Sequence, residues 1–562
     1  MSTVREPSIV DGIAEDYFDG LSDLYPSIPL FLGLDNDKGF DDYSPAGFEA
    51  AKDLRARALN RLADLETTAA INGSPSLNDT DDVTIDAMRE RFSVADDLFD
   101  SGLSHTVLNV IESPLQQMRD IFDLLPTRTT REWETIKSTL AGLPASISGY
   151  QESLTYAQQR SGRTPARAQI ERVREQSLAL AKENSRFDTL IEGAANLSTG
   201  LRNDLTAAAA AAKDSFAELS DYFAMLMTRA HDDEACGRDA YALHSRNYLG
   251  AEVDFEETYS WALDELNRID SEQKAIAKAI APGVGLFDVM AMLDNDPHRA
   301  LHGTEALQAW MQDVADEAIE KLGQTHFDIP EPLRTIECMI APSATGAVYY
   351  SQPSEDFSRP GRMWWSVPHG VTEFATWQEK TTVYHEGVPG HHLQMGQASY
   401  LADSLNRWRR HVCWVSGHGE GWALYAEQLM EELGFLDDPA DRLGMLDAQR
   451  LRTTRVALDI GFHLGLKAPT RLGGGTWDRA KAWQFLKDNV ATDRTFLAFE
   501  LDRYLGWPGQ APSYKIGHRL WQQIRHDAEA EAGETFDLKG FHSKALNLGS
   551  LGLDTLSRAM RR

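Results

Sequence analysis

Cysteine is scarce in this chain. The sequence holds three cysteines among 562 residues, Cys236, Cys338 and Cys413, and they lie far apart without any paired spacing. Disulfides form and persist in oxidising compartments, and nothing in this distribution indicates one. The expectation is therefore a reduced, cytoplasmic protein.

Long apolar runs are also missing. The N-terminal residues Met1 to Pro7 lack a basic region followed by an apolar run, so no signal peptide is expected. No stretch approaches the roughly 20 apolar residues that a membrane-spanning helix needs. The sequence therefore predicts no membrane partner.

Basic residues are too few to balance the acidic ones. The chain has 55 Lys and Arg against 86 Asp and Glu, which gives a formal net charge of -31. Such a surface repels a phosphate backbone at long range, and this argues against nucleic acid as a partner. Glycine-rich phosphate loops and tandem repeats are absent as well.

Helical periodicity is what the sequence has in abundance, from Ile13 to about Thr335. A chain of 562 residues is too long for one ordinary core, so we expect two associated lobes or one elongated domain. Apolar residues recur at helical spacing, and the charged residues between them are most simply solvated faces. Helices are predicted for residues 47–66, 83–99, 114–125, 131–140, 147–159, 164–183, 203–226, 259–280 and 304–322, with a break at Pro144.

The sequence changes character at Ile340. Residues 346–351 and 361–367 are short, aromatic and β-branched, and they predict two strands. One of them forms either an edge on which an extended peptide could pair its backbone, or part of a small structural hairpin. The change divides the chain into a helical scaffold, residues 1–335, and a second part, residues 336–562.

Three imidazoles and a carboxylate gather in the stretch from Tyr384 to Gln394. Its sequence is Tyr-His-Glu-Gly-Val-Pro-Gly-His-His-Leu-Gln. Imidazole and carboxylate are ligands of divalent metals such as zinc. Thr376 and Glu379 have the spacing of a capping box, which predicts a helix from Trp377 through His385.

The histidine spacing departs from that of the familiar zinc-peptidase helix, where two histidines lie four residues apart. Here the fourth residue after His385 is Pro389, which breaks the helical hydrogen-bond ladder. An unbroken helix would carry His392 about 10 Å along the axis, too far for one zinc ion. Either Pro389 and Gly390 make a wide turn that folds a histidine back, or these are ordinary polar residues beside a kinked helix.

A second predicted helix, residues 417–430, carries two glutamates. Glu420 and Glu427 are seven residues apart and therefore share a face with Leu424. A metal held by two histidines needs a third ligand, so we predict Glu420 as that ligand and Glu427 as a group that steadies a histidine. The alternative is that both glutamates face solvent.

Further polar residues recur downstream. Arg452, Arg455, Asp459 and His463 follow one another at helical steps, as a solvated face or as the wall of a polar cleft. Tyr514 and His463 are candidates to donate hydrogen bonds to the oxyanion of a hydrated carbonyl. The candidates for supporting the ligands or binding substrate are His392, Glu427, Arg455, Asp459, Arg503, Tyr504 and Lys515.

These segments resemble the bacterial family called domain of unknown function 885. The resemblance rests on His-Glu-x-x-Pro-Gly-His-His-x-Gln at residues 385–394 and Glu-Gly-Trp-Ala-x-Tyr-Ala-Glu at residues 420–427. Shorter matches are Arg-x-x-x-Asp-x-x-x-His at residues 455–463, Arg-Tyr at Arg503, and Ser-Tyr-Lys-x-Gly ending at Gly517.

That family in turn resembles the helical zinc peptidases of the thimet oligopeptidase, angiotensin-converting enzyme and Taq carboxypeptidase group. The resemblance implies a mainly α, two-lobed fold with a deep groove and a small β-hairpin or sheet beside the active-site helix. Because the Gly-His pair at residues 390 and 391 matches the motif of that group, it favours His391 over His392 as the second ligand.

The resulting hypothesis is a zinc-dependent hydrolase of short peptides. His385, His391 and Glu420 hold one zinc ion, and Glu386 takes a proton from water and passes it to the leaving amine. Two alternatives remain. One is hydrolysis of a non-peptide amide at the same metal, and the other is a non-catalytic helical binding protein whose degenerate motif holds no metal.

Overall fold

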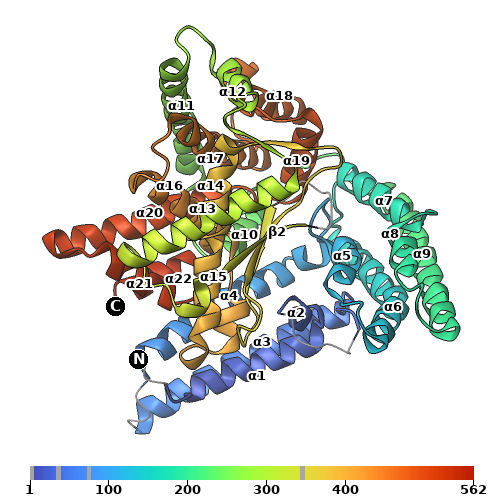
Figure 1. The fold of residues 1–562 in the computed structure, drawn as a ribbon. Helices are drawn as coiled ribbons and strands as arrows, with labels where there is room; N and C mark the ends of the chain where they lie inside the picture. The colour runs from blue at the N-terminus through green and yellow to red at the C-terminus, as the bar shows by residue number, and fades with distance from the viewer. Residues whose placement is uncertain (1–4, 33–38, 73–76, 342–347) are drawn as a thin grey trace.

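The computed structural model shows a mainly helical protein with two small β-sheets (Figure 1). It describes residues 5–32, 39–72, 77–341 and 348–562. The prediction of a mainly α fold is confirmed. Within these described ranges, no helix combines the length and the apolar character required to cross a membrane.

Three N-terminal helices pack against one another along one side of the molecule (Figure 1). They are α1 (Ile9–Leu24), α3 (Pro45–Asn72) and α4 (Asp79–Asp100). Ser8 begins α1, because its Oγ accepts the Asp11 N–H at 3.1 Å while the Asp11 carboxylate accepts the Ser8 N–H at 2.8 Å. Two of the helices predicted from periodicity lie within α3 and α4.

A second hydrophobic core lies in the bundle on the right of Figure 1, which consists of α5 (Pro114–Leu124), α6 (Thr130–Ser161), α7 (Arg167–Ala181) and α9 (Thr199–Met227). The main core, in contrast, combines helices from both ends of the chain. The predicted boundary between residues 335 and 336 and the predicted deep groove both remain predictions.

The predicted break at Pro144 is wrong. Helix α6 runs through Pro144 without interruption. An interior proline costs a helix about 3 kcal/mol. Leu140 and Leu143 on one side are 0% exposed and Ile147 on the other is 2% exposed. Burying each such side chain contributes about 1.5–3 kcal/mol, so packing along the whole helix outweighs the lost hydrogen bond.

The other predicted N-terminal helical ranges match observed helices, although the range 164–183 extends beyond both ends of α7 and the range 114–125 ends one residue after α5. The remaining helices outside the metal centre are α2 (Ser27–Phe31), α8 (Arg186–Glu192), α10 (Arg238–Leu249), α11 (Phe255–Ile280), α12 (Leu286–Asp294), α13 (Thr304–Thr325), α18 (Arg479–Asn489), α19 (Arg494–Gly506), α21 (Leu538–Asn547) and α22 (Leu553–Met560).

The larger sheet has the strand order β2-β4-β3. The two predicted strands are confirmed as β3 (Val348–Ser351) and β4 (Gly361–Trp365), which pair antiparallel; residues 346 and 347 lie outside the described residues. The sequence analysis does not predict β2 (Ile336–Ile340), which pairs parallel with β4. Strand β3 therefore lies at a sheet edge, and it contacts helices α14 and α15, which carry the histidines.

Glycines let the backbones of α16 (Ser416–Glu432) and α20 (Ser513–Ala532) approach closely. A Cβ atom on Gly517 would lie 2.1 Å from the Gly417 carbonyl oxygen, and one on Gly421 would lie 2.5 Å from the Gly517 carbonyl carbon. No real Cβ tolerates these distances, so a side chain would force the helices apart. This contact positions α16, which carries Glu420.

Replacing Gly517 by alanine is therefore expected to lower the free energy of unfolding by about 3 kcal/mol or more, since overpacking a close helix contact strains both backbones. The midpoint of urea-induced unfolding measures the change. Gly200→Ala on α9 is the matched control, because nothing lies within 4 Å of a Cβ at that position. It should leave stability unchanged or raise it slightly. Equal midpoints for the two variants would contradict the close-contact argument.

Candidate metal centre

His385 and Glu386 form the end of helix α14 (Thr376–Glu386), as predicted. Both are buried, at 4% and 6% exposure. Trp377 and Tyr384 anchor the helix in the main core. The side chains at its C-terminal end are therefore held in fixed positions.

The start of α14 differs from the prediction. Thr376 is the first helical residue, and no side chain of a Thr376–Glu379 capping box caps the helix. Instead, the chain enters from β5 (Glu373–Ala375), which pairs with β1 (Ala300–His302). The Thr376 N–H donates to the Arg299 carbonyl at 2.9 Å and continues this pairing. A carbonyl group of the strand pairing thus accepts the Thr376 N–H, which a capping side chain would otherwise accept.

The predicted wide turn at Pro389 and Gly390 is confirmed. The Gly390 N–H donates to the Tyr384 carbonyl at 3.1 Å, and the Trp422 indole N–H donates to the Pro389 carbonyl at 2.8 Å. A Cβ on Gly390 would lie 1.9 Å from a carbonyl oxygen of α14, so only glycine fits this position. The turn ends at helix α15 (His391–Tyr400), which starts beside the end of α14.

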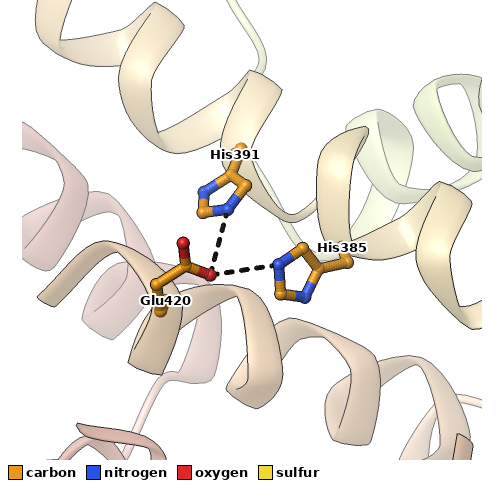
Figure 2. A group of neighbouring side chains, drawn as sticks. All are labelled: His385, His391 and Glu420. Atoms are coloured by element: carbon orange, nitrogen blue, oxygen red, sulfur yellow. Dashed lines mark hydrogen bonds and ion pairs between the residues drawn. The ribbon is translucent and has the colours of Figure 1, made fainter. Parts of the chain in front are cut away.

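This turn brings His391 to His385, and α16 supplies Glu420 (Figure 2). The Oε2 atom of Glu420 lies 3.2 Å from His385 Nε2 and 3.5 Å from His391 Nε2. The two imidazole rings are perpendicular, with centroids 4.8 Å apart. The three predicted ligands therefore form one group that could hold a metal ion.

The donor set fits a divalent metal of the zinc type. In a tetrahedral site with bonds of about 2.0–2.1 Å, ligand atoms lie about 3.3 Å apart. The ligand atoms of this group all lie within 4.8 Å of one another, so small adjustments suffice. Two nitrogens and one carboxylate oxygen leave a coordination position for water, as catalytic sites do.

Glu427 occupies the supporting position predicted for it. Its Oε1 lies 2.7 Å from His385 Nδ1, and its Oε2 accepts the Thr381 hydroxyl at 2.6 Å. The bond fixes the imidazole so that Nε2 faces Glu420. Burial lowers the pKa of His385, but hydrogen bonds to Glu420 and Glu427 outweigh it and raise this pKa to about 10. Burial raises the pKa of Glu420, but the two histidines outweigh it and hold this pKa below its usual range.

Glu386 is a buried carboxylate with a free oxygen. Among the described residues, no group hydrogen-bonds its Oε2 atom. Burial raises its pKa, against the opposing charges of His391 and His385. The positive charge of Arg452 also favours the ionised form of Glu386. Within the described part of the chain, the Nε atom of Arg452 has no hydrogen-bond partner. Glu386 is thus available to exchange a proton with water or substrate.

Both ring nitrogens of His392 make hydrogen bonds to groups outside the candidate metal group. Its Nε2 lies 3.0 Å from the Leu333 carbonyl, to which it must donate, so its Nδ1 accepts from the Tyr350 hydroxyl at 3.0 Å. Burial lowers the pKa of this imidazole to about 4. His392 therefore ties α15 to strand β3, and the structure brings His391 to Glu420 instead.

The predicted residues Arg455, Arg503 and Tyr504 meet in a buried cluster around Glu500. Arg455 Nη2 donates to Glu500 Oε2 at 2.9 Å, and Arg503 Nη1 donates to Glu500 Oε1 at 3.0 Å. Arg455 Nε donates to the Tyr504 hydroxyl at 2.8 Å. The Arg455 guanidinium also lies over the Tyr514 ring, 5.1 Å from its centroid.

Two effects raise the pKa of the Tyr514 hydroxyl. Burial raises the pKa of its hydroxyl, and the negative charge of Glu420 raises it further. A neutral phenol can donate a hydrogen bond, whereas a phenolate cannot. The Arg455 guanidinium packs over the ring, and the donor role of Tyr514 remains a prediction.

Asp459 and His463 are buried on α17 (Pro439–His463), so the solvated-face interpretation is wrong for them. His463 Nδ1 accepts the Cys236 N–H at 3.3 Å, and its Nε2 lies 3.0 Å from the Tyr504 carbonyl. Both nitrogens are thus bonded to backbone groups. The structure does not bring His463 into the metal group, and its predicted catalytic role remains a prediction.

The buried carboxyl group of Asp459 predicts that the stability of the protein depends on pH. Its Oδ1 accepts from Tyr241 and from the Gly509 N–H, while Oδ2 is buried with no hydrogen-bond partner among the described residues. Burial raises its pKa from 3.8 to about 7, although the bonds from Tyr241 and Gly509 oppose this. The folded state thus holds the proton more tightly than the unfolded state, so stability falls as the pH rises from about 4 to 7.

The Asp459→Asn variant removes this titration. Its Tm is expected to exceed that of the parent at pH 8 by more than at pH 5, because the parent buries an ionised carboxylate only at the higher pH. Thermal unfolding at both pH values measures the difference. Asp488→Asn, an exposed position on α18, controls for the change in net charge. A Tm difference for Asp459→Asn that does not depend on pH would contradict the raised pKa.

Lys515 is buried on α20 at 2% exposure. Its Nζ donates to Gln449 Oε1 at 2.9 Å and lies 3.2 Å from Glu265 Oε1 and 3.1 Å from His518 Nδ1. Burial lowers the pKa of Lys515, against the charge of Glu265. The side chain therefore supports the packing of α20, and its hydrogen bonds and ion pair go to residues outside the candidate metal group.

Sequence analysis did not assign the roles of four residues around the site. Thr381 holds Glu427, Trp422 holds the turn, Arg452 acts on Glu386 and Glu500 joins the two arginines. Thr381 lies four residues before His385 and so shares its helix face, which is a signal that spacing could have provided. The roles of the other three depend on contacts between distant segments.

A comparison with models of known protein families identifies the family of this chain. A family model described as a bacterial protein of unknown function (DUF885) matches residues 26–560. The chain belongs to this family. The resemblance carried by the histidine and glutamate motifs is thereby confirmed, and it extends through the helical N-terminal part. A comparison with curated proteins found no match.

Solved structures share the fold of this DUF885 protein. A candidate lipoprotein from Colwellia psychrerythraea matches with a TM-score of 0.79 and 22% identity, covering 98% of both chains. A candidate lipoprotein of unknown function from Shewanella oneidensis matches at 0.75 and 16% identity, covering 99% of this chain and 100% of that one. These identities establish the fold alone.

A more distant match is a carboxypeptidase from Pyrococcus furiosus, with a TM-score of 0.42 and 11% identity, covering 100% of this chain and 99% of that one. This similarity is too low to carry a functional argument. The description as candidate lipoproteins concerns the proteins from Colwellia psychrerythraea and Shewanella oneidensis, and the cytoplasmic location of this chain remains a prediction.

Proposed function

We propose that this protein is a zinc-dependent hydrolase that cleaves peptide bonds in short peptides. The observation that carries the proposal is the position of Glu386, a buried carboxylate with an unpartnered oxygen, directly after His385 in the metal group. A purely structural metal site has no use for such a group. A hydrolytic site needs a base beside its metal.

His385, His391 and Glu420 would hold the metal. A zinc ion there supplies Lewis-acid chemistry by polarising a water molecule and the carbonyl of the scissile bond. Glu386 accepts the proton of the attacking water and then donates it to the leaving amine. Its raised pKa supports both steps, because a carboxyl group of higher pKa is both a stronger base and able to return the proton.

Substrate orientation is assigned to two features around the metal group. On its other side β3 pairs with no strand of the described residues, and this edge, next to α14 and α15, offers backbone N–H and C=O groups to an extended peptide. The Tyr514 hydroxyl, held by the contact with Arg455, donates a hydrogen bond to the oxyanion that forms at the carbonyl. A short peptide can satisfy both contacts at once.

A substrate panel tests the proposal. Short peptides and non-peptide amides, such as N-acetylated anilines, are incubated with the protein before and after chelation and after zinc is restored. Cleavage of peptides that is lost on chelation and recovered with zinc is the expected result. Cleavage of the non-peptide amides alone would establish the alternative substrate class, and no cleavage by the zinc-loaded protein would favour a binding protein.

A further inference from the structure

A second cavity lies where helices α3, α4 and α10 meet α6 (Figure 1). Its described lining includes none of the three residues of the candidate metal group. The volume is about 330 Å³, which falls within the range of roughly 300–1,000 Å³ that small-molecule sites occupy. We call it the aromatic cavity, because Tyr and Phe side chains make up much of its lining: Tyr25, Tyr43, Phe48, Tyr150 and Tyr248.

Three of these rings are partly accessible. Tyr25, Phe48 and Tyr248 are half-buried, so each leaves part of its ring open to a ligand. Tyr248 also lines the cavity together with His244 and Asn247, which lie four residues and one residue before it on α10. Residues 244, 247 and 248 share one helix face, so α10 brings polar side chains to one wall.

The only charged side chain in the described lining is acidic. Asp41 is its single carboxylate, and the described lining residues include no lysine or arginine. Burial lowers the pKa of His105, and it lowers the pKa of His244 to about 4. Both imidazoles are therefore neutral at neutral pH, and an anion in the cavity would meet no counter-charge in its lining.

Asp41 places negative charge beside two of the rings. Its Oδ1 accepts the Ser27 N–H at 2.9 Å, and its Oδ2 accepts the Ser27 hydroxyl at 2.7 Å. These donors are neutral. Burial raises the pKa of Tyr25 and Tyr43, and the negative charge of Asp41 raises both further. Buried charges are normally paired, so a cation in the cavity would meet a carboxylate that its hydrogen bonds leave uncompensated in charge.

A second carboxylate adds to this negative potential. Burial raises the pKa of Tyr248 and Tyr43, and the negative charge of Glu112 raises both further. The positive charge of Arg55 also reaches Tyr25, but Arg55 is paired with Asp96 at 2.7 Å. The cavity therefore favours a cation over an anion.

We propose that the aromatic cavity binds a small organic cation that carries a substituted ammonium group. Aromatic rings attract such a group over their faces, and trimethylated ammonium groups are recognised in this way. Asp41 and Glu112 add their negative potential, and the polar wall of α10 bonds to a hydroxyl or carbonyl elsewhere in the ligand. Because the ligand contacts α3, α6 and α10 together, its binding to the folded state raises stability by mass action.

Titration calorimetry with choline tests this proposal. The reference ligand is the neutral isostere of choline, the alcohol in which a tert-butyl group replaces trimethylammonium. The full-length protein is used with zinc present, so that an organic cation cannot bind at the His385 group, and ionic strength is held constant. Saturable binding of choline at one site is expected, with the isostere at least tenfold weaker. This comparison uses the parent protein, so a folding defect cannot explain its result.

Variants then locate the site. Phe48→Leu removes a half-buried ring from the lining and should weaken choline binding about three- to tenfold. Phe40→Leu is the matched control, because Phe40 is also half-buried but packs on Phe122, with ring centroids 6.0 Å apart, and does not line the cavity. It should leave binding unchanged. Asp41→Asn should weaken the binding of choline severalfold without changing that of the isostere.

Three results would overturn the proposal: no saturable binding of choline, equal affinities for choline and its isostere, or equal losses in Phe48→Leu and Phe40→Leu. None of these outcomes bears on the proposed hydrolase activity, which depends on the His385 group.

Discussion

Replacing Glu386 by glutamine is expected to reduce peptide hydrolysis by at least about 10³-fold while the metal stays bound. Glutamine has nearly the same shape but cannot accept a proton from water. General base catalysis of this kind contributes roughly 10²–10⁴-fold to a rate. Because Glu386 follows the candidate ligand His385 but does not belong to the candidate metal group, zinc content should not change.

The measurement combines peptide turnover with elemental analysis of the same preparation. Glu379→Gln is the matched control, since Glu379 lies on the same helix seven residues earlier and outside the metal group. It should keep both activity and zinc. If Glu386→Gln retained turnover, the proposed base would be wrong. If it lost zinc along with activity, Glu386 would act on the metal rather than on the proton.

Replacing either histidine of the metal group by alanine is expected to abolish stoichiometric zinc binding. The parent protein, reconstituted with zinc, should hold close to one ion per chain. His385→Ala and His391→Ala each remove one of three protein ligands, which leaves too few donors for tight binding. Glu427→Gln weakens the orientation of His385 and should reduce zinc affinity by about 10–100-fold.

His392→Ala is the decisive control for this experiment. It removes the neighbouring imidazole, whose two nitrogens already bond to Leu333 and Tyr350, so zinc should be retained. Zinc kept in His391→Ala but lost in His392→Ala would move the second ligand to His392 and contradict the structure. A parent protein that takes up no zinc would favour the binding-protein alternative.

Local rules predicted much of the fold. Periodicity located most of the N-terminal helices, and aromatic, β-branched segments located β3 and β4. Local rules failed where distant contacts compensate for a local cost. Helix α6 continues through Pro144 because the bundle buries both sides of it, and α14 begins at Thr376 because strand pairing replaces the cap. A short window of sequence does not contain the distant residues that make these compensating contacts, so local rules cannot predict them.

The sequence by itself determined the side-chain chemistry of the candidate metal site. It supplied the ligand types, the spacing of Glu420 and Glu427 on one helix face, and the Pro389–Gly390 pair that made a turn necessary. Only the tertiary structure decided between His391 and His392, because that choice depends on how α15 packs against β3 and α16. The burial of Asp459 was decided in the same way. The chemistry of a side chain follows from its residue type, but its neighbours depend on packing between segments that are far apart in the chain.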